Sequence, residues 1–338
     1  MAQLQSTSIT GSLNLSSTTS TSGSIGHLWY NNSTCKLQYS FYGAVWSSGN
    51  TLSTARYGLG GAGTQTAALA FGGRDSCATE AYNGTSWSPG SNLINARFNL
   101  AGAGTQTAAL AFGGYATQPS FSTLACTEVY DGSSWSTGGA MINANQNFGG
   151  VGTQTAALAF SGFSRSSFSV LSCTEAYNGT SWSSGGAIIV GRCSLGGAGT
   201  QTAALAFGGC SQSNQVTSDT ESYNGTTWSP GGALINARQC LAGAGTSTAA
   251  LAFGGYTGQP SFSALTCTEA YNGTSWSSGG ALSTARFSLA GAGTNTSALA
   301  FGGRTPSTGP VGCTELFIEG IQSYSFNGTI TPPPYAGV

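Results

Sequence analysis

The chain has 338 residues, only 6% of them are charged, and its net charge at pH 7 is -1. A surface with so little charge has no basic field, so we expect the protein to bind neither nucleic acid nor anionic membranes. The first residues lack the basic start and apolar core of a secretory signal, and no apolar run has transmembrane length, so we expect no membrane insertion.

The chain begins with a segment that we interpret as an arm. Residues 1–26 are rich in Ser and Thr, a composition that cannot bury enough apolar surface to fold alone. We therefore expect an extended arm that becomes ordered against another subunit. Further on, the short apolar segments 38–41 and 45–46 predict the third and fourth strands of an incomplete unit.

The rest of the chain repeats one unit six times. The string Thr-Ala-Ala-Leu-Ala-Phe begins at Thr66, and close copies begin at Thr107, Thr155, Thr202, Thr248 and Thr296. Each unit also has one position that is usually Arg, such as Arg56, and this Arg position precedes the Thr by a constant number of residues. The number of residues from the Glu of Thr-Glu to the next Arg position is constant as well. All length differences therefore fall between Thr and Glu. A repeat of this kind predicts stacked or radially arranged units, here with one variable loop each.

Each unit has the pattern of four short strands. A run of small residues, a strand ending in a Gly pair, a strand with Cys-Thr-Glu and a strand that begins with Trp follow one another. Asn-Gly or Asp-Gly joins the last two and indicates a tight hairpin. The pattern predicts an all-β fold, a six-bladed β-propeller of four-stranded antiparallel blades, closed by an N-terminal strand. Seven blades are the alternative, if the residues left over at both ends build their own blade.

Six tryptophans recur at one position of the unit. Their regular place in the later strands favours packing between blades over stacking on sugars. They are Trp46, Trp87, Trp135, Trp182, Trp228 and Trp276.

Most of the charge also belongs to the repeat. Six glutamates share one position: Glu80, Glu128, Glu175, Glu221, Glu269 and Glu315. Five arginines share another: Arg56, Arg97, Arg192, Arg238 and Arg286. The constant spacing from each Glu to the next Arg position favours a structural ladder of buried Glu–Arg pairs, within one blade or between adjacent blades, and a ring of carboxylates that binds cations is the alternative. The third repeat has Asn145 at the Arg position, so we expect Glu128 to need another donor.

Residues that carry enzyme chemistry are scarce. His27 is the only histidine and precedes the repeats, and the chain has no Cys-x-x-Cys pair. Five of the nine cysteines occupy one repeat position, where we expect small buried side chains rather than disulfides. No nucleophile has a suitably placed base. We expect no catalytic residue, no metal site and no cofactor.

The variable loops are the candidate contact surface, because loops between second and third strands all open on one face of a propeller. Polar loops with a few aromatic residues suit carbohydrate or protein recognition. The candidate contact residues are Tyr115, Phe121, Phe163, Phe168, Tyr256 and Phe262. Packing of Phe121 and Phe262 back onto the blade is the alternative.

Two resemblances follow from these motifs. The order of a Gly pair, a Tyr, a Trp and an Arg over residues 37–319 resembles the kelch repeat, which implies four-stranded propeller blades but no single activity. Residues 26–38, with Leu-Trp-Tyr-Asn followed by Thr and Lys-Leu, resemble a hairpin of bacteriophage tail and fibre proteins. Residues 8–17 are similar to fibre-like β sequences of virion proteins.

We therefore divide the chain into an arm (1–26), a kelch-like propeller (27–320) and a C-terminal tail (321–338). We expect a virion structural protein of the tail, fibre or capsid surface, bound through its arm to other virion subunits in an oligomeric assembly. Contact with a host glycan or protein is expected through the loops. The alternative is a free-standing, lectin-like or adhesin propeller, outside the cell or on its surface.

Overall fold

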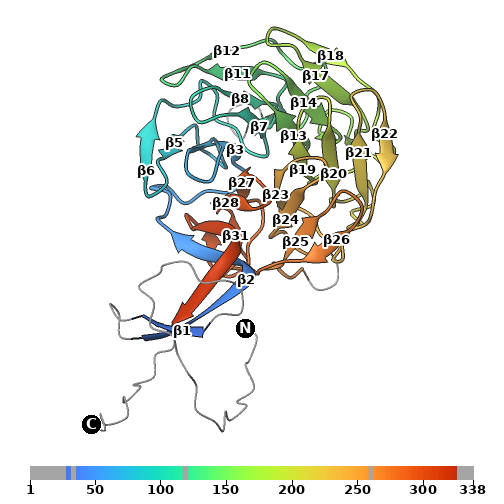
Figure 1. Ribbon diagram of the computed structural model, residues 1–338. Coiled ribbons are helices and arrows are strands. Elements are labelled where there is room, and N and C mark those ends of the chain that lie inside the picture. The colour runs from blue at the N-terminus through green and yellow to red at the C-terminus, as the bar shows by residue number, and fades with distance from the viewer. Residues whose placement is uncertain (1–27, 32–35, 117–120, 259–261, 326–338) are drawn as a thin grey trace, which may run out of the picture. The chain divides into compact units, whose positions relative to one another are not determined.

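The computed structural model describes residues 28–31, 36–116, 121–258 and 262–325 (Figure 1). All regular elements in these ranges are β-strands, and none of the described residues forms a helix that could cross a membrane. The chain divides into two compact units, Ala44–Ile318 and a second that combines Met1–Gly43 with Glu319–Val338. The expected arm, residues 1–26, lies outside the described residues, as do residues 326–338 of the expected tail.

The unit Ala44–Ile318 is a closed ring of antiparallel sheets around a central axis (Figure 1). Blade 1 contains β3 (Gly60–Gly63), β4 (Ala68–Phe71), β5 (Thr79–Tyr82) and β6 (Trp87–Gly90). Blade 2 contains β7 (Ala101–Gly104), β8 (Ala109–Phe112), β11 (Thr127–Tyr130) and β12 (Trp135–Thr137), and blade 3 contains β13 (Gly149–Gly152), β14 (Ala157–Phe160), β17 (Thr174–Tyr177) and β18 (Trp182–Ser184). Blade 4 contains β19 (Gly196–Gly199), β20 (Ala204–Phe207), β21 (Thr220–Tyr223) and β22 (Trp228–Pro230), and blade 5 contains β23 (Ala242–Gly245), β24 (Ala250–Phe253), β25 (Thr268–Tyr271) and β26 (Trp276–Ser278).

Blade 6 joins the two ends of the chain. Its strands are β27 (Ala290–Gly293), β28 (Ser297–Phe301), β31 (Thr314–Ser325) and β2 (Lys36–Gly49), and β1 (Leu28–Asn31) pairs with β2. The N-terminal strand therefore closes the ring, which removes the open edge that a sixth blade would otherwise present. The six-bladed propeller is confirmed, and the seven-blade alternative is wrong.

The N-terminal segment differs from the prediction in one respect. Residues 38–41 and 45–46 are not two strands, because β2 runs unbroken from Lys36 to Gly49. The third strand of blade 6 is already supplied by β31, whose Glu315 pairs with Ala300 as the repeat requires. The N-terminal segment therefore has only the fourth strand to supply. β31 itself continues to Ser325, past the predicted propeller end at residue 320.

The innermost strands approach one another so closely that they need glycine. A Cβ on Gly61 would lie 2.8 Å from the ring of Phe301 in blade 6, and one on Gly102 would lie 2.5 Å from the carbonyl oxygen of Gly61. Larger residues at these positions would push the blades apart. The small-residue strands of the sequence thus set how tightly the blades meet at the axis.

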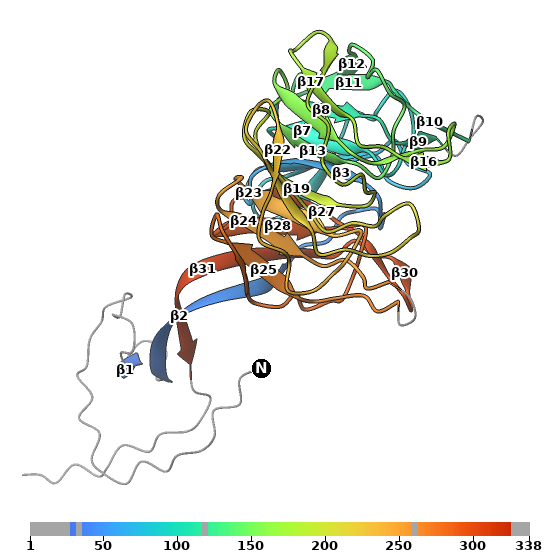
Figure 2. The ribbon, with the colours of Figure 1, turned by 90° about the vertical axis from the view of Figure 1, so that its right-hand side faces the viewer.

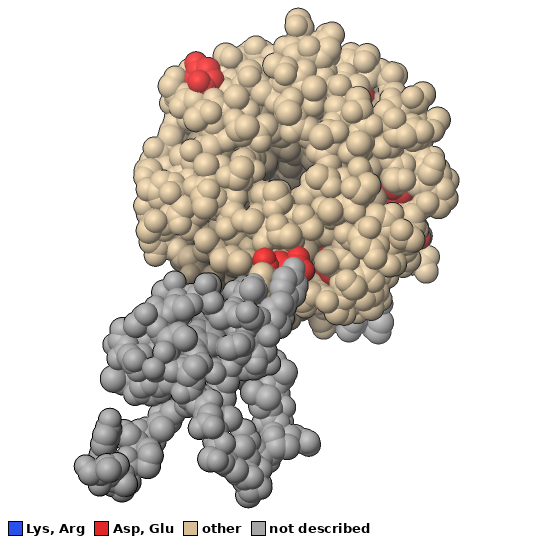
Figure 3. All heavy atoms as spheres, viewed as in Figure 1, with Lys and Arg blue, Asp and Glu red and all other residues tan. Residues whose placement is uncertain are grey.

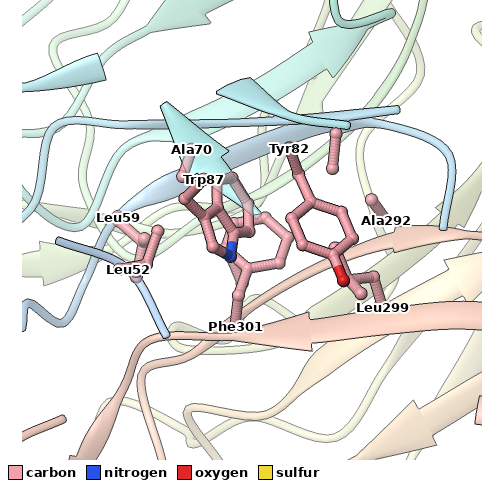
Figure 4. Packing of buried hydrophobic residues seen from close by; sticks show 10 residues of the cluster. Leu52, Leu59, Ala70, Tyr82, Trp87, Ala292, Leu299 and Phe301 are labelled. Atoms are coloured by element: carbon pink, nitrogen blue, oxygen red, sulfur yellow. The ribbon is translucent and has the colours of Figure 1, made fainter. Parts of the chain in front are cut away.

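The core lies between the blades and repeats around the ring. In Figure 4, Trp87 packs on Phe301 of the preceding blade, with Leu52, Leu59 and Tyr82 around it. Each Trp also donates a hydrogen bond of 2.9–3.0 Å from Nε1 to a Thr hydroxyl of the preceding blade. The pairs are Trp87–Thr314, Trp135–Thr79, Trp182–Thr127, Trp228–Thr174, Trp276–Thr220 and Trp46–Thr268. The tryptophans pack between blades, as predicted.

Candidate interaction face

The variable loops project from one face of the ring. Three of these loops contain a small hairpin whose two strands have two residues each: β9–β10, β15–β16 and β29–β30. Figure 2 shows β9, β10, β16 and β30 on the same side of the ring. These strands are β9 (Tyr115–Ala116), β10 (Ser122–Thr123), β15 (Phe163–Ser164), β16 (Ser169–Val170), β29 (Arg304–Thr305) and β30 (Gly309–Pro310). The segments that connect one blade to the next lie at the same end of the strands. We call this side of the ring the loop face.

The opposite face is different in character. It contains the tight turns between first and second strands and between third and fourth strands. On the described part of that face no Lys or Arg is visible, and the centre is hollowed (Figure 3). The turns are short and self-contained, since Asn83 Oδ1, for example, accepts the backbone N–H groups of Thr85 and Ser86. Variation between repeats is therefore concentrated on the loop face.

Three phenylalanines stand exposed on the loop face. Phe121, Phe168 and Phe262 expose 56%, 68% and 52% of their surface. Phe262 packs in part onto its own blade, because its ring centroid lies 6.2 Å from that of Tyr256. All three have positive φ, at 45°, 50° and 30°. This region is strained for a bulky side chain, and such strain concentrates at functional sites. Each of three variable loops thus contains an apolar residue that is both exposed and strained.

The loop of blade 3, which contains Phe168, contacts the loops of both neighbouring blades. The side chain of Gln212 in blade 4 accepts a hydrogen bond from the backbone N–H of Val170 and donates one to the carbonyl oxygen of Phe168, at 2.5 and 3.0 Å. Arg165 of blade 3 lies over the ring of Tyr115 in blade 2, 5.0 Å from its centroid. The loop that contains Phe168 is therefore held by its neighbour in blade 4, and it in turn contacts the base of the loop in blade 2.

The other three candidate residues have a supporting position. Tyr115 is buried and packs edge-on against Phe98, with 5.5 Å between the ring centroids. Phe163 and Tyr256 are half-buried at the base of their loops, and Tyr256 packs against Phe287 at 4.9 Å. These three side chains pack at the base of the loops, and the exposed aromatic side chains are Phe121, Phe168 and Phe262.

Exposed aliphatic residues extend this surface along the blade connections. Ile94, Ile142, Ile189 and Ile235 expose 55–56% of their surface, and Val190 exposes 42%. The backbone N–H of each Ile donates to a buried Glu of the same blade at 2.6–2.7 Å, while the preceding residue is buried. Sequence reasoning missed these residues, although the pair of apolar residues that recurs shortly before the Arg position in four of the six repeats could have revealed them.

The apolar residues gather on four of the six blades. At the Ile position, blades 1 and 6 have Ser53 and Ser283. We call the following set, on blades 2–5, the apolar arc: Ile94, Phe121, Ile142, Phe168, Ile189, Val190, Ile235 and Phe262. The loop face is thus divided into an apolar arc and a polar sector formed by blades 1 and 6.

The polar sector contains a pocket of about 410 Å³. Tyr57, Arg74 and Arg304 line it, together with Arg56, Asp75 and others. Arg74 donates a hydrogen bond to the Tyr57 hydroxyl at 3.0 Å, which raises the pKa of Arg74, and Arg304 lies 5.5 Å from the centroid of the Tyr57 ring. One guanidinium group over the Tyr57 ring and another at its hydroxyl thus place an aromatic ring and hydrogen-bond donors together.

The Glu–Arg ladder forms within blades, and its partners differ from those that the constant Glu-to-Arg spacing suggested. Arg56 lies 2.8 Å from Glu80, and Arg238 lies 3.1 Å from Glu269. The remaining pairs are Arg97–Glu128, Arg192–Glu221 and Arg286–Glu315. Each Arg pairs with the Glu that follows it, across the variable loop, because both belong to one blade. Burial lowers the pKa of Arg56, Arg192 and Arg238.

The expectation for Glu128 was therefore wrong, since Glu128 has Arg97 as its partner. The carboxylate without an arginine is Glu175. It accepts hydrogen bonds from the backbone of Ile142 and from the backbone and side chain of Asn143, at 2.7–3.0 Å. Each carboxylate is thus occupied inside its own blade. In the described ranges no group of three or more His, Cys, Asp or Glu is arranged to hold a metal ion.

A ring of six residues surrounds the axis at the loop face. All have positive φ, and the backbone N–H of each donates to the carbonyl oxygen of the previous one at 2.6–3.0 Å, with Gly58 closing the cycle onto Ser288. The members are Gly58, Asn99, Asn147, Ser194, Cys240 and Ser288. They line a cavity of about 130 Å³. We call this set the axial ring.

The fold has a counterpart among solved structures. A structure titled "Structure of YjhT" aligns with a TM-score of 0.69 and 13% sequence identity, over 81% of this chain and 99% of that chain. The protein is a six-bladed β-propeller. At this identity the similarity shows the fold alone. No protein-family model matches the sequence, and no curated protein matches it.

Proposed function

We propose that this propeller is a non-catalytic interaction scaffold of a bacteriophage-like virion, in which the apolar arc binds a partner. The observation that carries the proposal is the set of exposed phenylalanines Phe121, Phe168 and Phe262, each with a strained positive φ in a variable loop. Exposed apolar patches on a soluble protein mark binding surfaces. The members of the arc are apolar, and the exposed Arg165 lies three residues before Phe168 in the same loop, so the arc fits a partner surface that is mainly apolar.

A scaffold role is supported by the use of the charged residues. Five of the six repeat glutamates are paired with arginine inside a blade, and the sixth is bound by Asn143. These carboxylates hold the blade connections in place through backbone N–H groups, and none is free for proton transfer. We therefore infer a structural ladder rather than an active site, and no cofactor.

A place in a virion is supported by the N-terminal segment. Residues 26–38 resemble a hairpin of phage tail and fibre proteins, and in the fold this hairpin comprises β1 and the start of β2. β2 and β31 are both longer than any other strand, with 14 and 12 residues, and both continue into the second unit. We propose that residues 1–26 bind other virion subunits in an oligomeric assembly. The repeat itself we interpret as kelch-like.

The test is mass spectrometry and electron microscopy of native particles. Ordered copies of the chain on a virion or filament are the expected result, with the loop face toward a partner. The triple variant Phe121→Ser, Phe168→Ser, Phe262→Ser should fold but lose its partner, whereas Thr180→Ala, in a tight turn of the opposite face, should retain it. A purified chain that forms no particle contacts, or a triple variant that still binds, would refute the proposal.

A second candidate is a free-standing lectin-like propeller, and the pocket of the polar sector favours it. Tyr57 offers an aromatic face and Arg74 and Arg304 offer donors for sugar hydroxyls or carboxylates. A glycan array with the full chain would detect this activity. Binding that is lost in Arg304→Ala but retained in the triple Phe variant would establish the lectin function and its site.

A further inference from the structure

A backbone bridge at the base of the variable loop recurs around the ring. The residue after the Arg position pairs with the residue after the Gly-Gly position through two backbone hydrogen bonds, as in Phe98 and Tyr115, at 3.1 and 2.8 Å. The residue types at this bridge differ between blades. The pairs are Phe98–Tyr115, Gln146–Phe163, Cys193–Cys210, Gln239–Tyr256 and Phe287–Arg304. Blade 4 thus has cysteine on both sides.

The geometry of this pair suits a covalent bond. Cys193 and Cys210 exchange both backbone hydrogen bonds at 2.8 Å. Residues paired in this way have Cα atoms about 5.5 Å apart, inside the range of roughly 4.4–6.8 Å that disulfides require. The two Sγ atoms lie 3.0 Å apart, so the side chains already point at each other. Little backbone movement is needed to join them.

We propose that Cys193 and Cys210 form an intramolecular disulfide when the protein meets a small peroxide. A thiolate of the pair attacks one peroxide oxygen, the O–O bond breaks, and a sulfenic acid and hydroxide form. The second thiol then attacks the sulfenic sulfur, the S–S bond forms, and the sulfenic oxygen leaves as hydroxide. The two thiol protons convert the hydroxides to water, so two thiols and one hydrogen peroxide give one disulfide and two waters.

The surroundings indicate the order of attack and the kind of oxidant. The hydrogen bond from Cys210 lowers the pKa of Cys193, whereas the same bond and burial raise that of Cys210. Cys193 is also the more exposed of the two thiols, so it is the one that attacks first. Both side chains are buried, exposing 9% and 3%, so a small oxidant reaches them more readily than a protein does. Cys240, which lies in the axial ring, is the competing thiol.

The disulfide would cross-link blade 4 at the loop face. It would join the start of the first strand to the start of the variable loop, closing a segment that contains β19 and β20. A cross-link of this kind stabilises mainly by restricting the unfolded chain. The proposal concerns blade 4 alone and does not depend on the virion or lectin function.

Peptide mapping tests the proposal directly. Trypsin cleaves after Arg192 and Arg238 and at no site between them, so the peptide 193–238 contains Cys193, Cys210 and no other cysteine. The full chain is treated with hydrogen peroxide, denatured, alkylated and digested. The expected peptide has no alkyl group and is lighter by two hydrogen atoms, and prior reduction restores two alkylation sites.

Variants identify the partners. Cys240→Ser should still give the internal disulfide, whereas Cys193→Ser should leave Cys210 open to alkylation. Peroxide should raise the melting temperature of the natural chain by roughly 5 °C and that of Cys193→Ser not at all. Two alkylated cysteines after peroxide, separate oxygen adducts on each, or a cross-link to the peptide 239–286 that contains Cys240 would each overturn the proposal.

Discussion

Trp87 in β6 donates a 2.9 Å hydrogen bond to the hydroxyl of Thr314 in β31, which lies 227 residues further along the chain. The same bond joins every pair of neighbouring blades, so the first and last blades are connected in the same way as all others. The closing strand β2 takes part through Trp46, which donates to Thr268 at 2.9 Å. The ring is therefore uniform at its seam.

Removing one acceptor from this cycle should destabilise the ring. Thr79→Val keeps the shape of the side chain but leaves the buried N–H of Trp135 without its acceptor. We expect a loss of about 1–3 kcal/mol in the free energy of unfolding, measured by urea denaturation. The exposed Thr85→Val is the matched control and should change stability by less than about 0.5 kcal/mol. Equal effects of the two changes would show that the bond is unimportant.

The ladder contains its own comparison between a paired and an unpaired carboxylate. Glu128→Gln leaves the buried guanidinium of Arg97 without a countercharge, so we expect the free energy of unfolding to fall by about 3–5 kcal/mol. Glu175→Gln faces only amides and backbone N–H groups, so we expect a cost of about 1–2 kcal/mol. Thermal and urea unfolding of both variants measure the difference. A larger loss for Glu175→Gln would contradict the pairing described here.

Four seams between blades have a bridge from a glutamine side chain, and the described residues give none at the two seams where blades 5 and 6 have Ser247 and Asn295 instead. Gln201 donates from its side chain to the carbonyl oxygens of Ala157 and Tyr177 in blade 3, at 3.0 and 2.5 Å. The equivalent residue in blade 5 is Ser247, which lines a cavity of about 370 Å³. Ser247→Gln should restore the bridge and stabilise the protein by about 0.5–1.5 kcal/mol.

The reciprocal change provides the control for this seam. Gln201→Ser removes an existing bridge and should lower the melting temperature by an amount similar to the rise in Ser247→Gln. If Ser247→Gln leaves the melting temperature unchanged while Gln201→Ser lowers it, the cavity cannot accept the longer side chain.

A substitution that relieves the backbone strain at Phe168 should affect stability and partner binding in different ways. Phe168 has a φ of 50° and exposes 68% of its surface, and Asn accepts this backbone region more easily than Phe. Phe168→Asn should therefore keep or raise the stability of the ring, by about 1 kcal/mol at most, while weakening partner binding. Unfolding curves and a pull-down of virion subunits measure the two effects. Loss of stability in this variant would show that the ring of Phe168 packs on the protein.

The sequence was sufficient to predict the six blades. Invariant spacing, Asn-Gly turns and one Trp per unit are local signals, and the unpaired segment before Arg56 indicated closure by an N-terminal strand. The pairing of Arg97 with Glu128 was not predictable from spacing, because the variable loop separates the partners and changes their distance along the chain. The constant spacing, as from Glu80 to Arg97, instead connects residues of adjacent blades.

The loop face was predicted less completely. Phe121 and Phe168 could be selected from the variable loops, but the exposure of Ile142 depends on which way the blade connection turns after its buried Met141. The contact between Cys193 and Cys210 depends on a backbone bridge at the base of a loop, and no local pattern indicates it. Both features arise from the packing of one segment on another.

The axial ring also limits how the repeat number can change. Its hydrogen bonds run in one direction and return to their origin, from Gly58 onto Ser288, so the circle has neither a first nor a last member. If one repeat were lost, the backbone N–H of one ring residue would have to reach the carbonyl oxygen of the ring residue before the missing one. If one repeat were added, the axial ring would have to become wider, and the closely packed inner strands would have to move apart. Recombination between such similar units would create chains of five or seven repeats. The axial ring would disfavour the folding of both, because its hydrogen bonds close with six members.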